Sequence, residues 1–288
     1  MIPKKIHYCW FGGNPIDELG QKCLASWKKY FPDYEIIEWN ESNFDFNGCQ
    51  YVKEAYEAKK WAFVSDYARF KILYEEGGIY FDTDVEVIKP LDDIIARGNF
   101  MGAENTVPET SSDVGLNVAP GLGFGVAPGV NLMKEILDDY ERSSFLKPDG
   151  TNDLTTVVAR TTEILKLHGL QNVNEVQTVA DITIYPMEYF CPKDWQTGKI
   201  NITENTYCIH HFNASWYGEK EKIDLELWKF CNNKEICLIE KYGKEKGIKK
   251  YLRWKKRWKL KRYLKEGGIK LILHKVCAKL KTAFGGNA

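Results

Sequence analysis

The chain has 288 residues, of which 44% are hydrophobic, and it carries 40 basic and 40 acidic side chains. This length and apolar content can supply one large core or two small ones, which excludes an intrinsically disordered chain. Residues 114–133 carry no charge, but two prolines and five glycines interrupt them, so this segment is a poor candidate for a membrane-spanning helix.

The cysteines and the start of the sequence bear on the cellular compartment. None of the eight cysteines forms a C-x-x-C pair or shows zinc-ligand spacing, and no signal-peptide pattern precedes Ile2-Pro3-Lys4. We therefore expect reduced thiols in a cytoplasmic protein.

The net charge of zero hides an uneven distribution along the chain. Residues 241–288 contain 17 Lys and Arg against 2 Glu, a balance of +15, whereas residues 1–240 contain 23 basic and 38 acidic residues, a balance of −15. We therefore divide the sequence into a domain of residues 1–240 and a basic tail of residues 241–288.

The tail pattern predicts a basic amphipathic helix. Tyr251, Trp254 and Trp258 share one broad helical arc, and lysines and arginines surround them. Basic residues mixed with tryptophan suit the headgroups of an anionic membrane, which predicts a peripheral protein on the inner face of the plasma membrane. Packing of the tail on its own acidic body is the alternative. A nucleic-acid patch ranks below both, and we expect no nucleic-acid partner.

The body alternates strand and helix patterns, which predicts an α/β fold. The expected strands are residues 4–10, 34–39 and about 206–210, with a glycine-rich strand or loop at 121–128. The expected helices are residues 16–30, one or two within 51–76, 130–142 and 153–168.

The segment Gly77-Gly78-Ile79-Tyr80-Phe81-Asp82-Thr83-Asp84 carries two carboxylates just after a glycine break and a short apolar strand. Alternate residues of an extended chain point the same way, so we expect Asp82 and Asp84 to converge on one hard divalent cation, which can also hold a diphosphate. Aspartates near turns are also common surface residues, so the motif is weak without its context.

The preceding helical pattern adds a charged pair to this context. Phe63, Tyr67 and Phe70 recur at helical spacing, and Asp66 and Arg69 lie one turn apart among them. An exposed i,i+3 ion pair is the simplest interpretation of these two residues. Because aromatic residues cover a wide arc of this helix, however, we expect it to be largely buried, and a buried charged pair needs a function.

Four ordered motifs resemble a known group of enzymes. Asp66-x-x-Arg69, followed by Gly77-Gly78-Ile79-Tyr80-x-Asp82-x-Asp84, resembles the shared core of the DXD sugar transferases of glycosyltransferase family 32. That family includes fungal mannosyltransferases and bacterial capsular-polysaccharide enzymes, and the clostridial glucosylating toxins carry a similar core. The opening residues 2–13 are similar to the first strand and nucleotide loop of the family, and residues 210–216 to its closing His-x-x-x-x-Ser-Trp element. The resemblance covers about residues 1–218.

The resemblance implies a GT-A nucleotide-sugar transferase fold, here followed by a C-terminal helical extension. It implies a retaining hexosyltransferase that uses Mn2+ or Mg2+ and moves a sugar from a nucleotide-diphosphate donor, with a UDP-sugar favoured. The implied acceptor is a saccharide or a lipid-linked saccharide in capsule or surface-polysaccharide biosynthesis.

The resemblance also implies roles for single residues. The expected metal ligands are Asp82, Asp84 and His210, with His210 matching the family better than its neighbour His211. The residues expected to bind the donor or its nucleotide are His7, Trp10, Asp66, Arg69, Tyr80, Asp82, Ser215 and Trp216. The residues expected to act in catalysis are Asp66, Arg69, Asp82, Asp84 and Trp216. For Trp10 and Trp216 a core position is the alternative.

Two other functions compete with sugar transfer. A phosphohydrolase of the haloacid-dehalogenase type also uses Asp-x-Asp, but it expects Thr or Val two residues after the second aspartate, where this chain has Glu86. A non-catalytic carbohydrate- or membrane-binding protein could keep the fold alone, although the intact acidic and histidine positions disfavour it.

Overall fold

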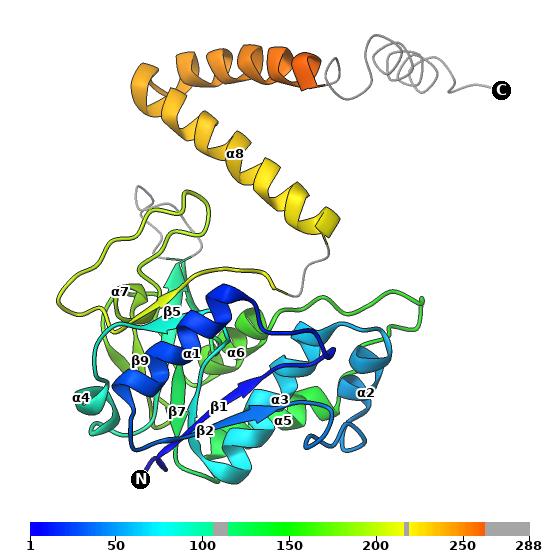
Figure 1. Cartoon of the computed structure of the whole chain (residues 1–288), viewed down its shortest axis with the longest axis vertical. Helices are drawn as coiled ribbons and strands as arrows, with labels where there is room; N and C mark the ends of the chain where they lie inside the picture. Colours follow the sequence, from blue (N-terminus) through cyan, green and yellow to red (C-terminus); the bar gives the residue numbers. More distant parts are fainter. Residues whose placement is uncertain (106–114, 216–218, 263–288) are drawn as a thin grey trace. The chain divides into compact units, whose positions relative to one another are not determined.

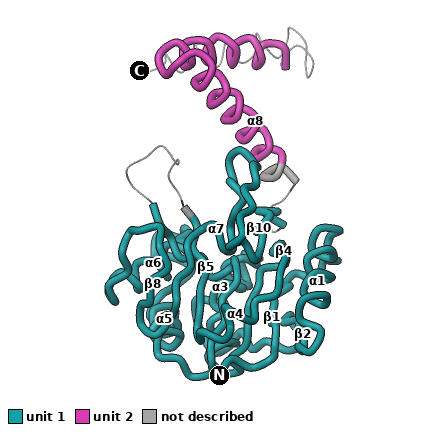
Figure 2. Tube along the Cα trace, turned by 90° about the vertical axis from the view of Figure 1, so that its left-hand side faces the viewer, with its two compact units in different colours: residues 1–216 teal, residues 217–288 magenta. Residues whose placement is uncertain are grey.

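The computed structural model describes residues 1–105, 115–215 and 219–262. The chain divides into two compact units, residues 1–216 and 217–288 (Figure 2). The sequence pattern placed the boundary at 240–241, where the positive charge begins. The structural division lies earlier because the long helix α8, Glu219–Tyr242, already belongs to the second unit.

The first unit has the predicted α/β architecture (Figure 1). Its main sheet has the strand order β2-β1-β3-β7-β5-β9-β8, with β6 paired to β5, and β4 and β10 form a separate two-stranded ribbon. The strands are β1 Lys5–Cys9, β2 Glu35–Trp39, β3 Gly78–Tyr80, β4 Val85–Val87, β5 Phe100–Asn105, β6 Leu116–Val118, β7 Phe124–Val126, β8 Gln177–Val179, β9 Ile182–Tyr185 and β10 Cys208–His210.

The sheet is mixed. Strand β1 pairs in parallel with both β2 and β3, and β5 pairs in parallel with β9, whereas β7 runs antiparallel between β3 and β5. The helices of this unit are α1 Glu18–Tyr30, α2 Gln50–Glu57, α3 Trp61–Glu76, α4 Asp92–Ile95, α5 Asn131–Glu141, α6 Val157–Leu167 and α7 Met187–Phe190.

Two hydrophobic cores form on opposite faces of the sheet because successive strand residues face opposite sides. On β1, Ile6 and Tyr8 pack with Trp27 of α1 in one core, while Cys9 packs in the other with residues of α2, α3, α5 and α6. Strands β1 and β3 are parallel neighbours, so their carboxyl ends lie at the same edge of the sheet, between the two cores. This is the edge at which α/β folds bind ligands.

The described residues of the second unit, 219–262, form a pair of helices. Helix α8 ends at Tyr242, Gly243 adopts φ 77°, and a further helical segment covers residues 244–262. A Cβ at Gly247 would lie 2.5 Å from the Cα of Ile239, so the two helices approach closely at this glycine. Within the part of the chain that the structure describes, no helix is both long and apolar enough to cross a bilayer.

Three aromatic residues of the predicted tail, Tyr251, Trp254 and Trp258, form aromatic contacts within this helix pair. The ring centroid of Phe230 on α8 lies 5.7 Å from that of Trp254 and 5.8 Å from that of Trp258, and Tyr251 is buried. The tryptophans are thus partly covered by α8 within the second unit, and packing of the tail on the acidic body stays an untested alternative. Tyr263 and the rest of the predicted tail lie outside the described residues.

Candidate active site

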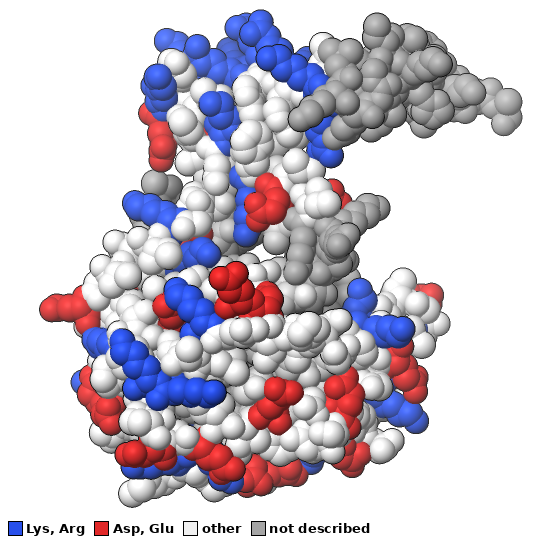
Figure 3. Space-filling model, in the orientation of Figure 1, with Lys and Arg blue, Asp and Glu red and all other residues white. Residues whose placement is uncertain are grey.

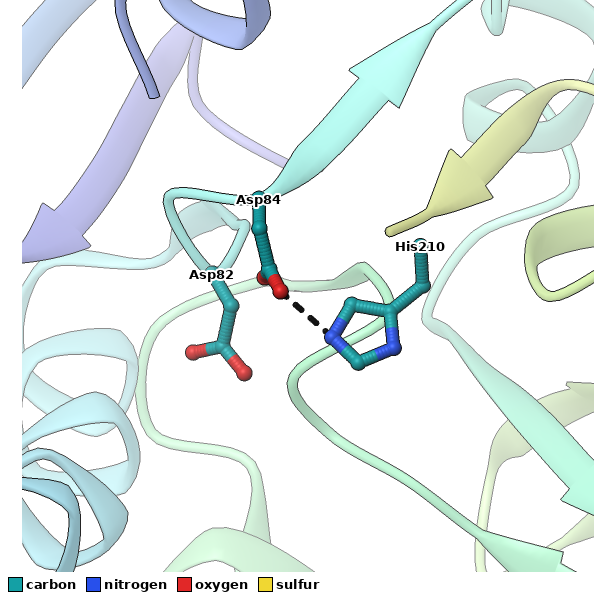
Figure 4. Close-up of side chains that lie close together, drawn as sticks. All are labelled: Asp82, Asp84 and His210. Carbon is teal, nitrogen blue, oxygen red and sulfur yellow. Dashed lines mark ion pairs between the residues drawn. The ribbon is translucent and has the colours of Figure 1, made fainter. Parts of the chain in front are cut away.

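Asp82 and Asp84 lie in a turn between β3 and β4 (Figure 4). The two carboxylates converge as expected, but strand alternation is not the cause, because β3 ends at Tyr80, before either aspartate. The backbone N–H of Val85 donates to the carbonyl of Asp82 at 3.0 Å, and the N–H of Asp82 donates to the carbonyl of Gly121 at 3.0 Å. The turn, which the Asp82–Gly121 hydrogen bond joins to the segment before β7, therefore sets the direction of the two carboxylates.

The ribbon of β4 and β10 brings His210 to this turn. Its antiparallel register places His210 opposite Val85, beside Asp84, and the His210 Nε2 lies 3.2 Å from the Asp84 Oδ1 (Figure 4). One ligand atom each from Asp82, Asp84 and His210 lie within 4.8 Å of one another. Two carboxylates and an imidazole within this distance fit a divalent ion such as Mn2+, and the carboxylates also suit Mg2+.

The neighbouring His211 lies outside this cluster. Its Nε2 is 2.8 Å from the Oε2 of Glu86, which also contacts the Nζ of Lys22 at 2.7 Å. The two histidines therefore have separate partners, and the geometry favours His210 as the ligand.

Asp84 and His210 shift each other's pKa in opposite directions. Burial raises the pKa of Asp84, but the His210 charge and hydrogen bonds outweigh burial and lower the pKa to about 2. Burial lowers the pKa of His210, but the Asp84 carboxylate outweighs burial and raises the pKa well above its usual range. A metal ion bound by the His210 Nε2 would therefore displace a proton.

The loop after β10 supports Asp84 from its other side. The backbone N–H of Asn213 donates to the Asp84 Oδ2 at 2.7 Å, and the Asn213 side chain donates to the Oδ2 of Asp17 at 2.6 Å. Phe212 and Ala214 both adopt the left-handed region, with φ 54° and 47°, which is unfavourable for residues other than glycine. Neither Asn213 nor Asp17 was predicted from the sequence, although Asn213 lies inside the His-x-x-x-x-Ser-Trp element. Ser215 follows in a partly exposed turn, and Trp216 lies outside the described residues.

On the other side of the cluster, helix α3 supplies Asp66 and Arg69. The Arg69 Nη2 lies 3.0 Å from the Asp66 Oδ1 and 3.2 Å from the Asp82 Oδ1. Asp66 is 7% exposed and Arg69 is 4% exposed, so this pair is not a surface ion pair. Tyr80 is buried, and its hydroxyl donates to the Asp82 Oδ1 at 3.2 Å. Arg69 and Tyr80 thus fix the orientation of Asp82.

Burial acts on the pKa values of both Asp66 and Arg69. Burial raises the pKa of Asp66 to about 7, although the positive charge of Arg69 opposes the rise. Burial lowers the pKa of Arg69, but the Asp82 carboxylate and its other negative neighbours outweigh burial and raise it. Arg69 therefore stays cationic and links the α3 carboxylate to the carboxylate of the turn.

The Asp82 carboxylate occupies space that is free only because Gly121 has no side chain. A Cβ at this position would lie 1.9 Å from the Asp82 Oδ2 and 3.2 Å from the Arg69 Nη1. The first glycine of the run 121–125 thus packs directly against a predicted metal ligand.

His7 and Trp10 come from β1 and its carboxyl end. The Nε2–H of His7 donates to the carbonyl of Gly77 at 3.0 Å, and its Nδ1 accepts from the Trp39 Nε1–H at 3.0 Å. Both ring nitrogens are thus used inside the fold and His7 is fully buried, which argues against the predicted nucleotide contact. Trp10 is half-buried, and its Nε1–H donates to the carbonyl of Asn14 at 2.5 Å. Part of its ring remains available for stacking.

The environment of His7 predicts a pH dependence of stability. Burial lowers the pKa of His7 from 6.5 to about 4, so the unfolded chain takes up a proton at a higher pH than the folded chain. The free energy of unfolding is therefore highest above pH 6.5. It falls as the pH approaches about 4, by roughly 3 kcal/mol in all. We expect His7→Gln to reduce this slope in urea unfolding curves measured across that range. If the dependence of unfolding stability on pH were unchanged in this variant, buried His7 would not be its cause.

Comparison with known proteins identifies this region. Residues 17–101 match the family model described as the glycosyltransferase sugar-binding region containing the DXD motif. Over these residues the chain is similar to the sugar-binding region of the DXD glycosyltransferases. The match includes Asp66, Arg69, Asp82 and Asp84, and it confirms the resemblance that the sequence motifs indicated.

Two relatives support this class of enzyme. Inositol phosphoceramide mannosyltransferase 1 of Schizosaccharomyces pombe is 29% identical over 109 residues, which are 35% of this chain and 33% of that protein. An uncharacterized glycosyltransferase of Acanthamoeba polyphaga mimivirus is 26% identical over 250 residues, which are 83% of this chain and 92% of that protein. This chain thus spans only a third of the yeast relative but nearly the whole of the viral one.

Among solved structures, the PaToxG glycosyltransferase aligns with 58% of this chain and 69% of its own, at 19% identity and a TM-score of 0.44. This likeness is weak. The α/β assignment therefore depends on the strand order and pairing described above, and the enzyme class on the motif and the sequence relatives.

Proposed function

We propose that the protein is a metal-dependent glycosyltransferase that moves a sugar from a UDP-sugar to a saccharide acceptor. The observation that carries the proposal is the cluster of Asp82, Asp84 and His210, joined through Asp82 to the buried Arg69–Asp66 pair. A divalent cation and a guanidinium beside one carboxylate suit a ligand that combines a diphosphate with sugar hydroxyls.

The proposed roles follow from position. When bound by the cluster, Mn2+ or Mg2+ would supply positive charge to the departing diphosphate. Asp66 and Arg69 face the cluster from α3 and would hold sugar hydroxyls, while Tyr80 holds Asp82 in place. The half-buried ring of Trp10, at the carboxyl end of β1, would stack on the base. Ser215 and Trp216 would close the site after β10. We further propose retention of the anomeric configuration.

A thermal-shift screen of nucleotide sugars with and without Mn2+ tests the proposal. A ligand that binds only the folded state raises its apparent stability, so UDP-sugars should raise the Tm only when Mn2+ is present. Stabilisation by guanosine diphosphate sugars alone would change the proposed base. Binding without any turnover would favour a non-catalytic carbohydrate-binding protein.

The two adjacent histidines provide a matched test of the metal site. We expect His210→Ala to weaken Mn2+ binding at least about tenfold, because it removes a ligand. His211→Ala removes only the contact with Glu86 and should leave Mn2+ affinity near that of the unaltered protein. Isothermal titration of both variants with Mn2+ measures the difference. Equal, small effects would make both histidines structural.

For the acceptor, we propose a lipid-linked saccharide in surface-polysaccharide assembly, reached at the inner face of an anionic membrane. The name of the fission-yeast relative joins mannosyl transfer to inositol phosphoceramide, a lipid, which supports an acceptor that is carried on a lipid. In the second unit, residues 244–262 contain eleven Lys and Arg and one Glu. Figure 3 shows basic side chains gathered on this unit. Leu252 and Leu260 are exposed beside these charges, as an interfacial helix requires.

Charge reversal tests the membrane proposal. Lys256→Glu together with Arg257→Glu should weaken binding to vesicles containing phosphatidylglycerol at least about tenfold, since each basic residue near the surface contributes about 1 kcal/mol. The control is Lys28→Glu with Lys29→Glu, which reverses two exposed charges on α1. Vesicle co-sedimentation at two salt concentrations provides the measurement. Equal losses in both double variants would show that net charge alone attracts the protein.

A further inference from the structure

Asp17, at the start of α1, makes a contact across the chain that helix capping does not explain. Its Oδ1 accepts from the backbone N–H of Gly20 at 2.8 Å and caps α1, while its Oδ2 accepts from the Asn213 side chain at 2.6 Å. Serine caps a helix about as well as aspartate does. Capping alone therefore needs only one oxygen, and the second oxygen of Asp17 serves the loop after β10.

Helix α1 is a fixed support for this contact, because it packs beside β4 (Figure 2). The Nε1–H of Trp27, which is fully buried, donates to the carbonyl of Val85 on β4 at 2.8 Å. In the first turn of the helix, a Cβ at Gly20 would lie 3.6 Å from the carbonyl oxygen of Thr83, which belongs to the turn between β3 and β4. The start of α1 thus lies next to the turn that carries the metal ligands.

The loop that contains Asn213 adopts a conformation that needs support. Phe212 and Ala214, on either side of Asn213, both have positive φ. Such backbone angles cost energy outside glycine and persist only where surrounding contacts hold them. The backbone N–H of Asn213 donates to the Asp84 Oδ2 at 2.7 Å, and the ring centroid of Phe212 lies 4.3 Å from that of His210. The same loop therefore contacts two of the three clustered ligands.

We propose that Asp17 and Asn213 are positioning residues of the metal site. Their hydrogen bond ties the loop to α1 and so keeps the backbone N–H of Asn213 on the Asp84 carboxylate. Without this tie the loop relaxes towards ordinary backbone angles, which withdraws the N–H from Asp84 and moves Phe212 relative to His210. Neither Asp17 nor Asn213 is among the clustered ligands, so both act through other residues. This inference rests on the proposed function.

Two substitutions at Asp17 separate positioning from capping. Asp17→Ser keeps an oxygen for the Gly20 N–H but is too short to reach Asn213. It should weaken Mn2+ binding about tenfold, as changes to groups that orient metal ligands do, and leave the Tm nearly unchanged. Asp17→Asn keeps the cap, and its amide can donate to the Asn213 side-chain oxygen when the Asn213 amide turns over. Its Mn2+ affinity, measured by isothermal titration, should stay near that of the unaltered protein.

Exchange of the two side chains tests the pair directly. Asn213→Asp places two carboxylates at hydrogen-bond distance, so their repulsion should open the loop and weaken Mn2+ binding at least about tenfold. Asp17→Asn together with Asn213→Asp restores one donor and one acceptor and should restore the affinity. In the metal-free protein, backbone amide exchange of residues 210–215 should be faster in Asn213→Asp and normal in the double variant.

The matched control is Thr156→Ala, which removes the cap of α6, where the Thr156 hydroxyl accepts from the N–H of Ala159 at 3.2 Å. This change should lower the Tm and leave Mn2+ affinity unchanged. Mn2+ affinity that is unaltered in Asp17→Ser, or equally weak in Asn213→Asp and in the double variant, would overturn the inference while leaving the proposed function intact. An unaltered protein that binds no Mn2+ would refute both the inference and the proposed metal-dependent transfer.

Discussion

Asp84→Asn should lower sugar transfer by about 1,000-fold or more and should remove the response to Mn2+. Its carboxylate accepts the Asn213 N–H, contacts His210 and is one of the three clustered ligands, so the amide removes the charge at the centre of the site. Positive charge at a departing diphosphate is among the largest contributions to such reactions. Steady-state turnover of a UDP-sugar across Mn2+ concentrations measures both effects.

The control for this change is Glu86→Gln, an isosteric change two residues further along the chain. Glu86 contacts Lys22 and His211 and lies outside the cluster. Its Gln variant should keep the Mn2+ requirement and most of the turnover. Comparable losses in both variants would show that the ribbon of β4 and β10, and not a metal ligand, explains the effect.

Gly121→Ala should lower turnover by roughly 100-fold while leaving the protein folded. The new Cβ would lie 1.9 Å from the Asp82 Oδ2, and the end of a side chain can rotate away whereas the backbone cannot. Rotation would break the contacts of Asp82 with Arg69 and Tyr80, both at 3.2 Å, and move a metal ligand. A misplacement of about 1 Å can cost this much rate. Turnover and Tm measured on the same sample separate the site from the fold.

Gly48→Ala is the matched substitution at a glycine where a Cβ would meet no atom within 4 Å. It should change neither turnover nor Tm appreciably. If Gly121→Ala were as active as Gly48→Ala, the position of the Asp82 carboxylate would not matter for transfer, and the proposed role of the turn would be wrong.

The sequence predicted the elements with strong periodicity and clear boundaries. The helical pattern before Gly77-Gly78 corresponds to α3, which ends at Glu76, and the strand expected at 34–39 corresponds to β2. The charged pair on α3 was expected to be buried because aromatic residues cover most of that helix, and Asp66 and Arg69 are indeed buried. Local pattern alone was sufficient for these elements.

The sequence could not predict features that depend on long-range pairing. Strands β6, β7 and β8 have three residues each, too few to show a period. The contact of Gly121 with Asp82 and that of Asn213 with Asp84 join segments far apart in the chain. The carboxylates converge through a turn, whose geometry a strand pattern does not contain. His7 was matched to a nucleotide loop by its place in a motif. In the fold, both of its ring nitrogens form hydrogen bonds, with Trp39 and Gly77.

The most direct test of the proposed metal site is Mn2+ binding measured by electron paramagnetic resonance, with and without UDP, in the unaltered protein and in Asp84→Asn. We expect the unaltered protein to bind Mn2+ and UDP to strengthen this binding, because the diphosphate and the cluster share the ion. Asp84→Asn should abolish both effects. Mn2+ binding of equal strength in the two proteins, unaffected by UDP, would contradict the proposed site.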